Sequence, residues 1–596
     1  MGDVTDIQDL KVKRESKRTL ADELAATQEE SESQRDKLIK IGMTATLFHD
    51  DISGDRVGYA TIKRKEHREV WPIRSKRFKD WLRAQYVNSQ DGKGVSSQAV
   101  QETIDTLDAI ACWSEASSAH KVHQRVAWDE NDGIWIDLCD EKWQAVKVSA
   151  NGWEVVDKPD VYFTRKRGML ALPQPVSDGD WSSLWSIANL KTKEQRIMAI
   201  AWLLGALRPA GPYPILVVEG EQGSGKSLLS RLLRGLIDPN EATSRRPPRD
   251  ERDLFIAAGN NHVVAFENLS GLPQWLSDAL CVLSTGGGFA TRALYENSEE
   301  TIINAMRPIL LNGIDAIATR GDLRDRTLLL TLNRIPDDER QSEAEIWHEY
   351  ERVKSQIFGL LLDAVSAALR YWDSTKLEKA PRMADFARWI IAAEQGGSLP
   401  WDPGEFLEVY LSAQTQMTAQ AIESDKLAQA IIDMMRREHE GGEWTGTATQ
   451  LAHTLTPYVE NPDFKRDTWL YNPRVMGNRL RRIAPDLRVQ GLDIRFGTVG
   501  HEKTRIITLE DKGNSLSATS ATPAWGEKTN GGAESWADKH ADNDLSLSAK
   551  SRFLSATMSA EKSSSGADLS VVADNAGNAD KHFPTLSIGP DVEVFD

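Results

Sequence analysis

The 596-residue chain has few cysteines, no long apolar run and a deficit of positive charge. Its three cysteines, Cys112, Cys139 and Cys281, are too widely spaced for a disulfide framework or a zinc motif, and they suit a reducing compartment. No apolar run approaches the roughly 18 residues of a membrane span, and the charged N-terminal stretch has no signal-peptide core. We therefore expect a cytoplasmic protein without membrane contact.

The formal net charge of −17 limits how the chain can meet nucleic acid. An acidic surface repels DNA, so a DNA contact must use a local basic surface or a lined channel. The length predicts about three to five domains. The expected segments are a charged arm (1–43), a Trp-rich α+β module (44–175), a helical linker or collar (176–210), a nucleotide-binding core (211–336), a helical region (337–439), a basic domain (440–510) and a disordered tail (511–596).

The Trp-rich module mixes two periodicities. Short strands are expected at 47–48, 57–62 and 70–71, helices at 77–86 and 97–113, and a meander of short strands between 122 and 156. We interpret its tryptophans as packing residues rather than base-stacking platforms. No paired-carboxylate strand or zinc module of the kind used in primer synthesis is visible there.

A glycine-rich loop between an apolar β-branched run and a Leu-rich helical pattern organises the rest of the chain. The loop matches the phosphate-binding pattern without a mismatch: Gly220, Glu221, Gln222, Gly223, Ser224, Gly225, Lys226 and Ser227. Its glycines let successive N–H groups point at one anion, Lys226 can reach the β- and γ-phosphates, and Ser227 can ligate Mg²⁺. A chance Gly/Ser turn would not place strand, loop and helix in this order, so we predict that the chain binds ATP and Mg²⁺.

Two later apolar runs end in polar side chains that suit the same site. Glu267 and Asn268 follow the run from 263, and Glu267 either handles the metal or polarises the attacking water. Asn268 can orient water but cannot remove a proton. Asn312 ends the run from 308, where it can sense the γ-phosphate; its alternative role is that of a turn former.

Arginines precede the next apolar run, at 327–332. Arg326, and after it Arg320, can reach the γ-phosphate of a neighbouring subunit and stabilise transition-state charge. The alternative is a surface cluster of ion pairs with the nearby aspartates. Between Glu267 and Asn312, residues 285–303 read as a β-hairpin, in which Arg292 would contact a DNA backbone in a central pore; a plain surface hairpin is the alternative.

The C-terminal basic domain reverses the charge of the whole chain. Residues 465–505 hold ten Lys or Arg against four acidic residues. Helices at 447–455 and 472–483, followed by strands at 492–496 and 504–509, suggest a winged helix. Five side chains are candidate phosphate contacts: Arg474, Arg481, Arg482, Lys503 and Arg505. A winged helix that packs against protein is the alternative.

Several stretches together resemble a known family: EGEQGSGKS, AFENLSGLPQWLSDALCVLSTGGGFATRALYEN, RPILLNGI, the DLRDR run and PRMADFARW. They are similar to the superfamily 3-like helicases of phages, plasmids and genomic islands. The resemblance implies an AAA+ ring with ATP sites between subunits, translocating on one DNA strand, expected 3′ to 5′. It carries over Lys226, Ser227, Glu267 (where the family usually has Asp), Asn312 and either Arg320 or Arg326. Priming activity does not carry over.

The expected fold is therefore α/β and multidomain, with a P-loop AAA+ core, an α+β N-terminal module and a winged-helix-like C-terminal domain. The expected function is that of an ATP-dependent DNA helicase, acting as a homo-hexamer on single-stranded or forked DNA in mobile-element replication. A separate primase or replication initiator is an expected further partner. The alternative function is a DNA-binding ATPase switch or defence ATPase that does not unwind processively.

Overall fold

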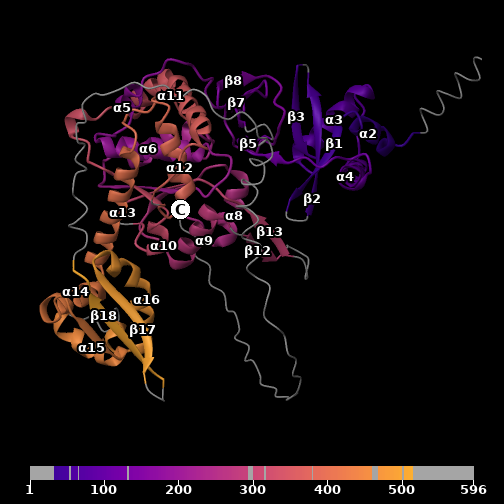
Figure 1. Cartoon of the computed structure of the whole chain (residues 1–596). Helices are drawn as coiled ribbons and strands as arrows, with labels where there is room; N and C mark the ends of the chain where they lie inside the picture. Colours follow the sequence, from indigo (N-terminus) through magenta and orange to yellow (C-terminus); the bar gives the residue numbers. More distant parts are fainter. Residues whose placement is uncertain are drawn as a thin grey trace, which may run out of the picture. The chain divides into compact units, whose positions relative to one another are not determined.

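The computed structural model describes residues 32–513 except 53–54, 65, 130–132, 287, 293–299, 315–316, 379, 460–466 and 500–502 (Figure 1). Most of the expected N-terminal arm and nearly all of the expected tail lie outside these residues. None of the described helices has the length and apolar character needed to cross a membrane.

The first part of the N-terminal module is a three-stranded antiparallel sheet covered by helices. Its elements are α2 (Gln34–Gly42), β1 (Thr46–Ile52), β2 (Asp55–Arg64), β3 (His67–Pro72), α3 (Lys76–Ser89) and α4 (Ser97–Trp113), with strand order β1-β2-β3. Ser75 and Ser96 cap α3 and α4 by accepting hydrogen bonds from backbone N–H groups. Trp71, Phe78 and Leu107 meet in the core between sheet and helices. The predicted strands and helices are confirmed.

An antiparallel meander follows. It consists of β5 (Val126–Trp128), β6 (Ile134–Asp137), β7 (Ala145–Ser149) and β8 (Gly152–Val156), in that spatial order, while β4 (Val122–His123) pairs with β9 (Tyr162–Phe163). Trp135 is buried, and Trp153 donates through Nε1 to Oδ1 of Asp363 at 2.8 Å. The meander is confirmed, and these two tryptophans pack rather than face solvent.

A parallel four-stranded sheet forms the central core. Its strands are β10 (Ile215–Gly220), β11 (Val264–Leu269), β14 (Ile309–Gly313) and β15 (Thr327–Leu332), in the order β11-β14-β10-β15. Alternate residues of β10 enter different apolar clusters, Leu216 in one and Val217 in the other. The sheet is therefore buried on both faces, which explains why its strands read as continuous apolar runs. The chain is a mixed α/β multidomain protein.

Helices pack on both faces of this sheet and contribute to the two apolar clusters. They are α5 (Ser182–Ile187), α6 (Lys193–Ala206), α7 (Lys226–Gly235), α8 (Glu251–Asn260), α9 (Gln274–Thr285), α11 (Glu343–Tyr371), α12 (Ala384–Glu394) and α13 (Glu405–Ser424) (Figure 1). Helix α6, expected as part of a linker or collar, is buried along almost its whole length and shares an apolar cluster with β10, α11 and α12. It is apolar on every side because every side is packed.

The expected hairpin is present as β12 (Gly288–Arg292) and β13 (Glu300–Asn304), paired antiparallel with Arg292 opposite Glu300. Its turn and the Arg292 side chain lie outside the described residues, so the predicted DNA contact of Arg292 stays a prediction.

The C-terminal domain comprises α14 (Lys426–Glu438), β16 (Glu443–Gly446), α15 (Ala448–Leu455), α16 (Pro473–Val489), β17 (Leu492–Val499) and β18 (Thr504–Asp511), with strand order β16-β18-β17. Its apolar cluster includes α14, ahead of the expected boundary at 440. The predicted end of α16 near residue 483 is wrong. The helix continues through Pro485, because Ala484 and Leu487 are buried in the cluster and their packing offsets the proline.

Candidate nucleotide-binding site

The phosphate-binding loop joins β10 to α7 and adopts a conformation that requires glycine. Gly223 and Gly225 have φ of 85° and 82°, in the left-handed region. A Cβ on Gly220 would lie 2.5 Å from the carbonyl oxygen of Leu332. Gly225 is the N-cap of α7 and offers no side-chain cap, so the first N–H groups of this helix are available to an anion.

Lys226 is the first residue of α7 and folds back over its own loop. Its Nζ donates to the carbonyl oxygens of Gly220 and Glu221, each at 2.8 Å. Burial lowers the pKa of Lys226, because the ammonium loses water without gaining a carboxylate. A phosphate in the loop would supply the missing negative charge.

Two buried oxygens of the predicted site lack hydrogen-bond partners, and they bear on whether the site suits Mg²⁺ and a nucleotide. Ser224 Oγ and Glu267 Oε1 are buried and have no hydrogen-bond partner among the described residues. Thirteen buried side-chain nitrogen or oxygen atoms of the described residues lack a partner, and these two belong to residues of the predicted nucleotide site, where a bound ligand would supply one. The described part of the chain also holds no group of three or more His, Cys, Asp or Glu that could bind a metal ion. The unpartnered Glu267 Oε1 is an oxygen of the kind that Mg²⁺ takes when it is shared with nucleotide phosphates, and Ser227 and Glu267 stay its predicted ligands.

A β-bulge presents Glu267. The pairing of β11 with β14 shifts register between Phe266 and Leu269, and Asn268 within this bulge has a φ of 57°. Bulges turn side chains away from the regular alternation of a strand. The bulge places Glu267 at the carboxyl end of β11, the edge of a parallel sheet where ligands bind.

Asn312 holds this edge together. It is 1% exposed, lies in register with Val218 of β10, accepts a hydrogen bond from the N–H of Asn268 at 3.0 Å and donates to Ser230 Oγ on α7 at 3.0 Å. Glu267 and Asn312 thus lie on adjacent strands. Both ends of the Asn312 amide are occupied, so in this structure Asn312 positions the bulge and does not face solvent.

The two candidate arginines flank a short helix, α10 (Gly321–Arg324). Arg320 forms an ion pair with Asp278 on α9 at 2.8 Å. Arg326 is half-buried, donates through Nη1 to the carbonyl oxygen of Asp322 at 2.6 Å, and its Nε has no partner among the described residues. Arg324 is buried and bonded to Asp486 of the C-terminal domain.

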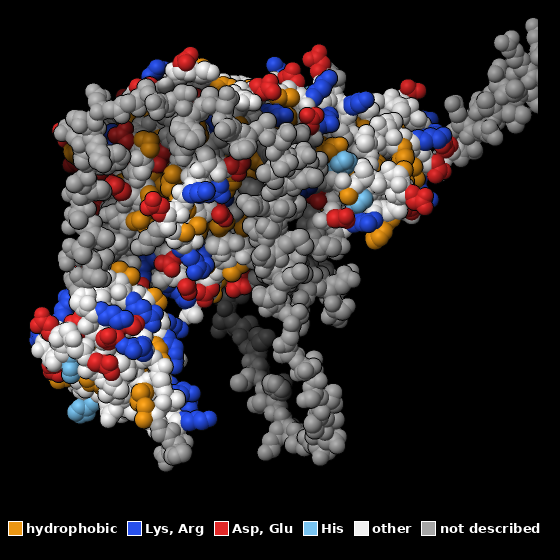
Figure 2. Space-filling view, in the orientation of Figure 1, with side chains coloured by type: hydrophobic (Ala, Val, Ile, Leu, Met, Phe, Trp, Pro, Cys, Tyr) orange, Lys and Arg blue, Asp and Glu red, His pale blue; other side chains and the backbone are white. Residues whose placement is uncertain are grey.

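The predicted phosphate contacts of the C-terminal domain are exposed. Lys and Arg side chains gather on this domain in Figure 2. The five candidates lie on α16 or at the β17–β18 hairpin, and none has an ion pair within the described residues: Arg474, Arg481, Arg482, Lys503 and Arg505. The Arg481 guanidinium stacks over the Phe496 ring at 4.7 Å.

Sequence reasoning missed two residues near the loop. Glu219, near the end of β10, accepts a hydrogen bond from the N–H of Ile317 at 2.7 Å, and burial raises its pKa. Asn189 donates through Nδ2 to the carbonyl oxygens of Ser224 and Asn333. Glu219 belongs to a run that reads only as a strand, and Asn189 lies more than 30 positions before the loop, so no local pattern marks either residue.

Comparison with known proteins gives a family for two long stretches. A comparison with curated protein sequences gave no match. Among solved structures, the NrS-1 C-terminal region is 12% identical with a TM-score of 0.37, covering 81% of this chain and 100% of that one. The JCV helicase is 15% identical with a TM-score of 0.18, covering 37% and 65%. Both TM-scores are too low to establish a common fold.

Residues 182–399 match the family described as actinomycete integrative conjugative element replication protein. Residues 427–524 match the C-terminal domain of the same replication protein, called RepA. Together the two matches cover more than half of the chain. They include the phosphate-binding loop, Glu267, Asn312 and the basic helix α16. Across these two stretches the chain belongs to the replication protein family of actinomycete integrative conjugative elements.

Proposed function

We propose that this replication protein is an ATP-dependent DNA helicase that works as a ring of identical subunits. The observation that carries the proposal is a glycine loop that opens α7 without a side-chain cap, together with two buried oxygens that have no partner among the described residues, Ser224 Oγ in the loop and Glu267 Oε1 on β11. A loop of this kind binds the phosphates of a nucleoside triphosphate.

Each residue of the site has a role in hydrolysis. The free N–H groups of α7 and the ammonium of Lys226 would hold the phosphates, while Ser227 and Glu267 would hold Mg²⁺, whose charge would stabilise the transferred group. Glu267 also orients the attacking water. Asn312 keeps the bulge in place through its bond to the N–H of Asn268. Arg326, or Arg320 once released from Asp278, completes the site of a neighbouring subunit.

The strand order supports the AAA+ assignment of the core. The chain passes from β10 to β11, returns to β14 between them, and then crosses β10 to reach β15. The loop after β10 therefore lies where the strand order reverses, which is where open parallel sheets bind ligands. The sequence resemblance favours a ring of the superfamily 3 type. In such a ring, β12 and β13 would line the central pore.

The C-terminal domain would hold DNA as a winged helix. Its order of helix, strand, two helices and a hairpin, with β16 paired to β18, supports this assignment. In such a domain the third helix, here α16, enters a groove while the hairpin contacts the backbone. Arg474, Arg481 and Arg482 on α16 are exposed and not committed to ion pairs within the described residues.

Three assays on the full chain test the proposal. ATP hydrolysis is measured with and without single-stranded DNA, strand displacement is measured on a forked duplex, and native mass is measured with nucleotide and DNA. We expect a ring, stimulated hydrolysis and displacement, and we expect hydrolysis and displacement to be lost in Lys226→Ala. Stimulated hydrolysis without displacement would support a DNA-binding ATPase switch instead. A chain that stays monomeric with both ligands would contradict the ring.

A further inference from the structure

A segment after β15 lies directly against the phosphate-binding loop. We call residues 333–342 the strap. The N–H of Ile335 donates to the carbonyl oxygen of Gly223 at 3.4 Å, and the Ile335 Cδ1 atom lies 3.4 Å from the position a Cβ on Gly225 would take. The strap therefore covers the loop over the two glycines that give it its shape.

Both ends of the strap are tied to elements around the loop. Near its start, Asn189 Nδ2 donates to the carbonyl oxygen of Asn333 at 2.8 Å and to that of Ser224 in the loop at 3.0 Å. Towards its end, Lys191 pairs with Glu339 at 2.8 Å. Just beyond it, Glu343 at the start of α11 pairs with Arg231 of α7 at 2.7 Å. The strap is thus held over the loop of its own chain.

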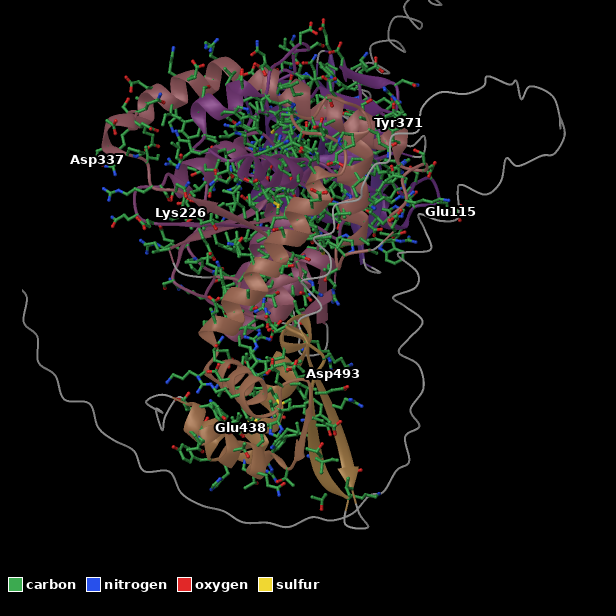
Figure 3. The ribbon with its side chains drawn as sticks, turned by 60° about the vertical axis from the view of Figure 1, so that its left-hand side comes forward. Glu115, Lys226, Asp337, Tyr371, Glu438 and Asp493 are labelled. Atoms are coloured by element: carbon green, nitrogen blue, oxygen red, sulfur yellow. The ribbon has the colours of Figure 1, made fainter. Side chains whose placement is uncertain are left out.

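Arg340 brings a second cation to this loop. Its Nη2 lies 3.0 Å from the position a Cβ on Gly223 would occupy, so any side chain there would meet the guanidinium. Arg340 is held by Asp337 at 3.0 Å, and both side chains are open to solvent, at 46% and 75% exposure (Figure 3 labels Asp337 and Lys226). An exposed ion pair of this kind contributes little energy, so the Arg340 guanidinium can leave Asp337 for a stronger partner.

We propose that Arg340 contacts the phosphates of the nucleoside triphosphate bound in its own subunit, and that Asn189 is the positioning residue that keeps the strap on the loop. This inference rests on the proposed nucleotide site. On binding, the guanidinium leaves the single carboxylate of Asp337 for phosphate oxygens that carry more charge and match its fork of donors. Asp337 is then left with water and with Arg334, 3.7 Å away, at little cost because it is exposed.

Equilibrium binding of a fluorescent ATP analogue with Mg²⁺ to the full chain tests the proposal. Arg340→Ala should raise the Kd about tenfold, because a charge-assisted hydrogen bond contributes about 1.5 kcal/mol and each 1.4 kcal/mol is a factor of ten. Arg334→Ala is the matched control, since Arg334 lies on the same strap and near the same Asp337, at 3.7 Å. It should change the Kd less than twofold.

Further variants separate a phosphate contact from a structural role. Arg340→Lys keeps the charge without the fork and should fall between wild type and Arg340→Ala. Asp337→Asn removes the competing carboxylate and should tighten binding about threefold; weaker binding would contradict the exchange. Asn189→Ala should weaken binding in the presence of Arg340 but add little to Arg340→Ala, which a purely structural role would not produce.

The outcomes distinguish this inference from the proposed function. If Arg340→Ala binds the analogue within twofold of wild type while Lys226→Ala loses binding, the role of Arg340 is wrong and the nucleotide site stands. If wild type does not bind, or Lys226→Ala binds equally well, the nucleotide site itself is wrong. Thermal unfolding without nucleotide should be the same for wild type and Arg340→Ala, because the side chain is half-exposed.

Discussion

Arg324 of α10 donates a hydrogen bond through Nη2 to Oδ1 of Asp486 on α16. The two side chains are 5% and 18% exposed, and the other end of the guanidinium donates to the carbonyl oxygen of Thr319 at 2.8 Å. This ion pair joins the segment that carries Arg320 and Arg326 to the helix proposed to contact DNA. Both ends of the Arg324 guanidinium are therefore bonded within its own chain, and Arg324 is not one of the two arginines proposed to act on a neighbouring subunit.

Removing Asp486 should destabilise this connection. Asp486→Ala leaves a buried guanidinium without a carboxylate, which costs about 3 kcal/mol in comparable pairs. We expect a lower unfolding midpoint in urea and earlier proteolysis between the core and the C-terminal domain. Arg324→Leu combined with Asp486→Leu should recover most of the loss. Asp493→Ala, which removes surface pairs in the same domain, is the control; an equal loss there would contradict a special role for Asp486.

Arg326→Ala should separate binding from turnover. Because Arg326 is proposed to act on the γ-phosphate of a neighbouring subunit, the variant should bind ATP normally and lose hydrolysis by roughly 10³-fold. Mixing it with Lys226→Ala chains should restore part of the activity, since some interfaces then pair an intact loop with an intact arginine. Arg320→Ala should have a smaller effect because Arg320 is paired with Asp278. Full turnover by Arg326→Ala would show that the finger assignment is wrong.

His262 should make stability fall in mild acid. Burial lowers its pKa from 6.5 to about 4, an effect larger than the opposing charge of Asp238, while Arg307 and Arg125 lower the pKa further. Below pH 6.5 the unfolded chain therefore takes up a proton that the folded chain refuses. The free energy of unfolding should decrease as the pH falls from about 6.5 to about 4, by at most about 3 kcal/mol for this group.

Denaturant unfolding across this pH range, in wild type and His262→Gln, measures the effect. Glutamine keeps a donor for the carbonyl oxygen of Ala206, which lies 2.8 Å from Nε2 of His262. The variant should show a shallower dependence on pH. Some dependence should remain, because burial also lowers the pKa of His123 to about 4. Identical slopes for the two proteins would contradict the prediction.

The exposed arginines of α16 should contribute to DNA binding in a salt-dependent way. Arg474→Ala, Arg481→Ala and Arg482→Ala should each weaken binding of a forked DNA several-fold and reduce the slope of log K against log salt by about 1. Arg488 is the matched control, since it lies on the same helix but pairs with Asp493 at 2.9 Å. Anisotropy titrations at several salt concentrations measure both quantities. An equal loss of DNA affinity in Arg488→Ala would contradict a specific role for Arg474, Arg481 and Arg482 in contacting phosphates.

The sequence alone determined which local elements form and where the phosphate-binding loop lies. The loop, the apolar strands and the hairpin depend on residues adjacent in the chain: glycines at left-handed positions, β-branched runs, and alternation with period two. Such local preferences do not depend on distant contacts, so the predicted strands of the core agree with β10, β11, β14 and β15. The short edge strand β16 was missed, because only its pairing with β18 makes it a strand.

Only the tertiary structure decided how distant residues meet. It placed β14 between β10 and β11, gave Asn312 its partners Asn268 and Ser230, and committed Arg324 to Asp486. It also carried α16 past Pro485, through burial of neighbouring side chains, and laid the strap over the loop. These outcomes follow from packing and from the pairing of buried polar groups, which depend on every element present at once. No window of sequence contains that information.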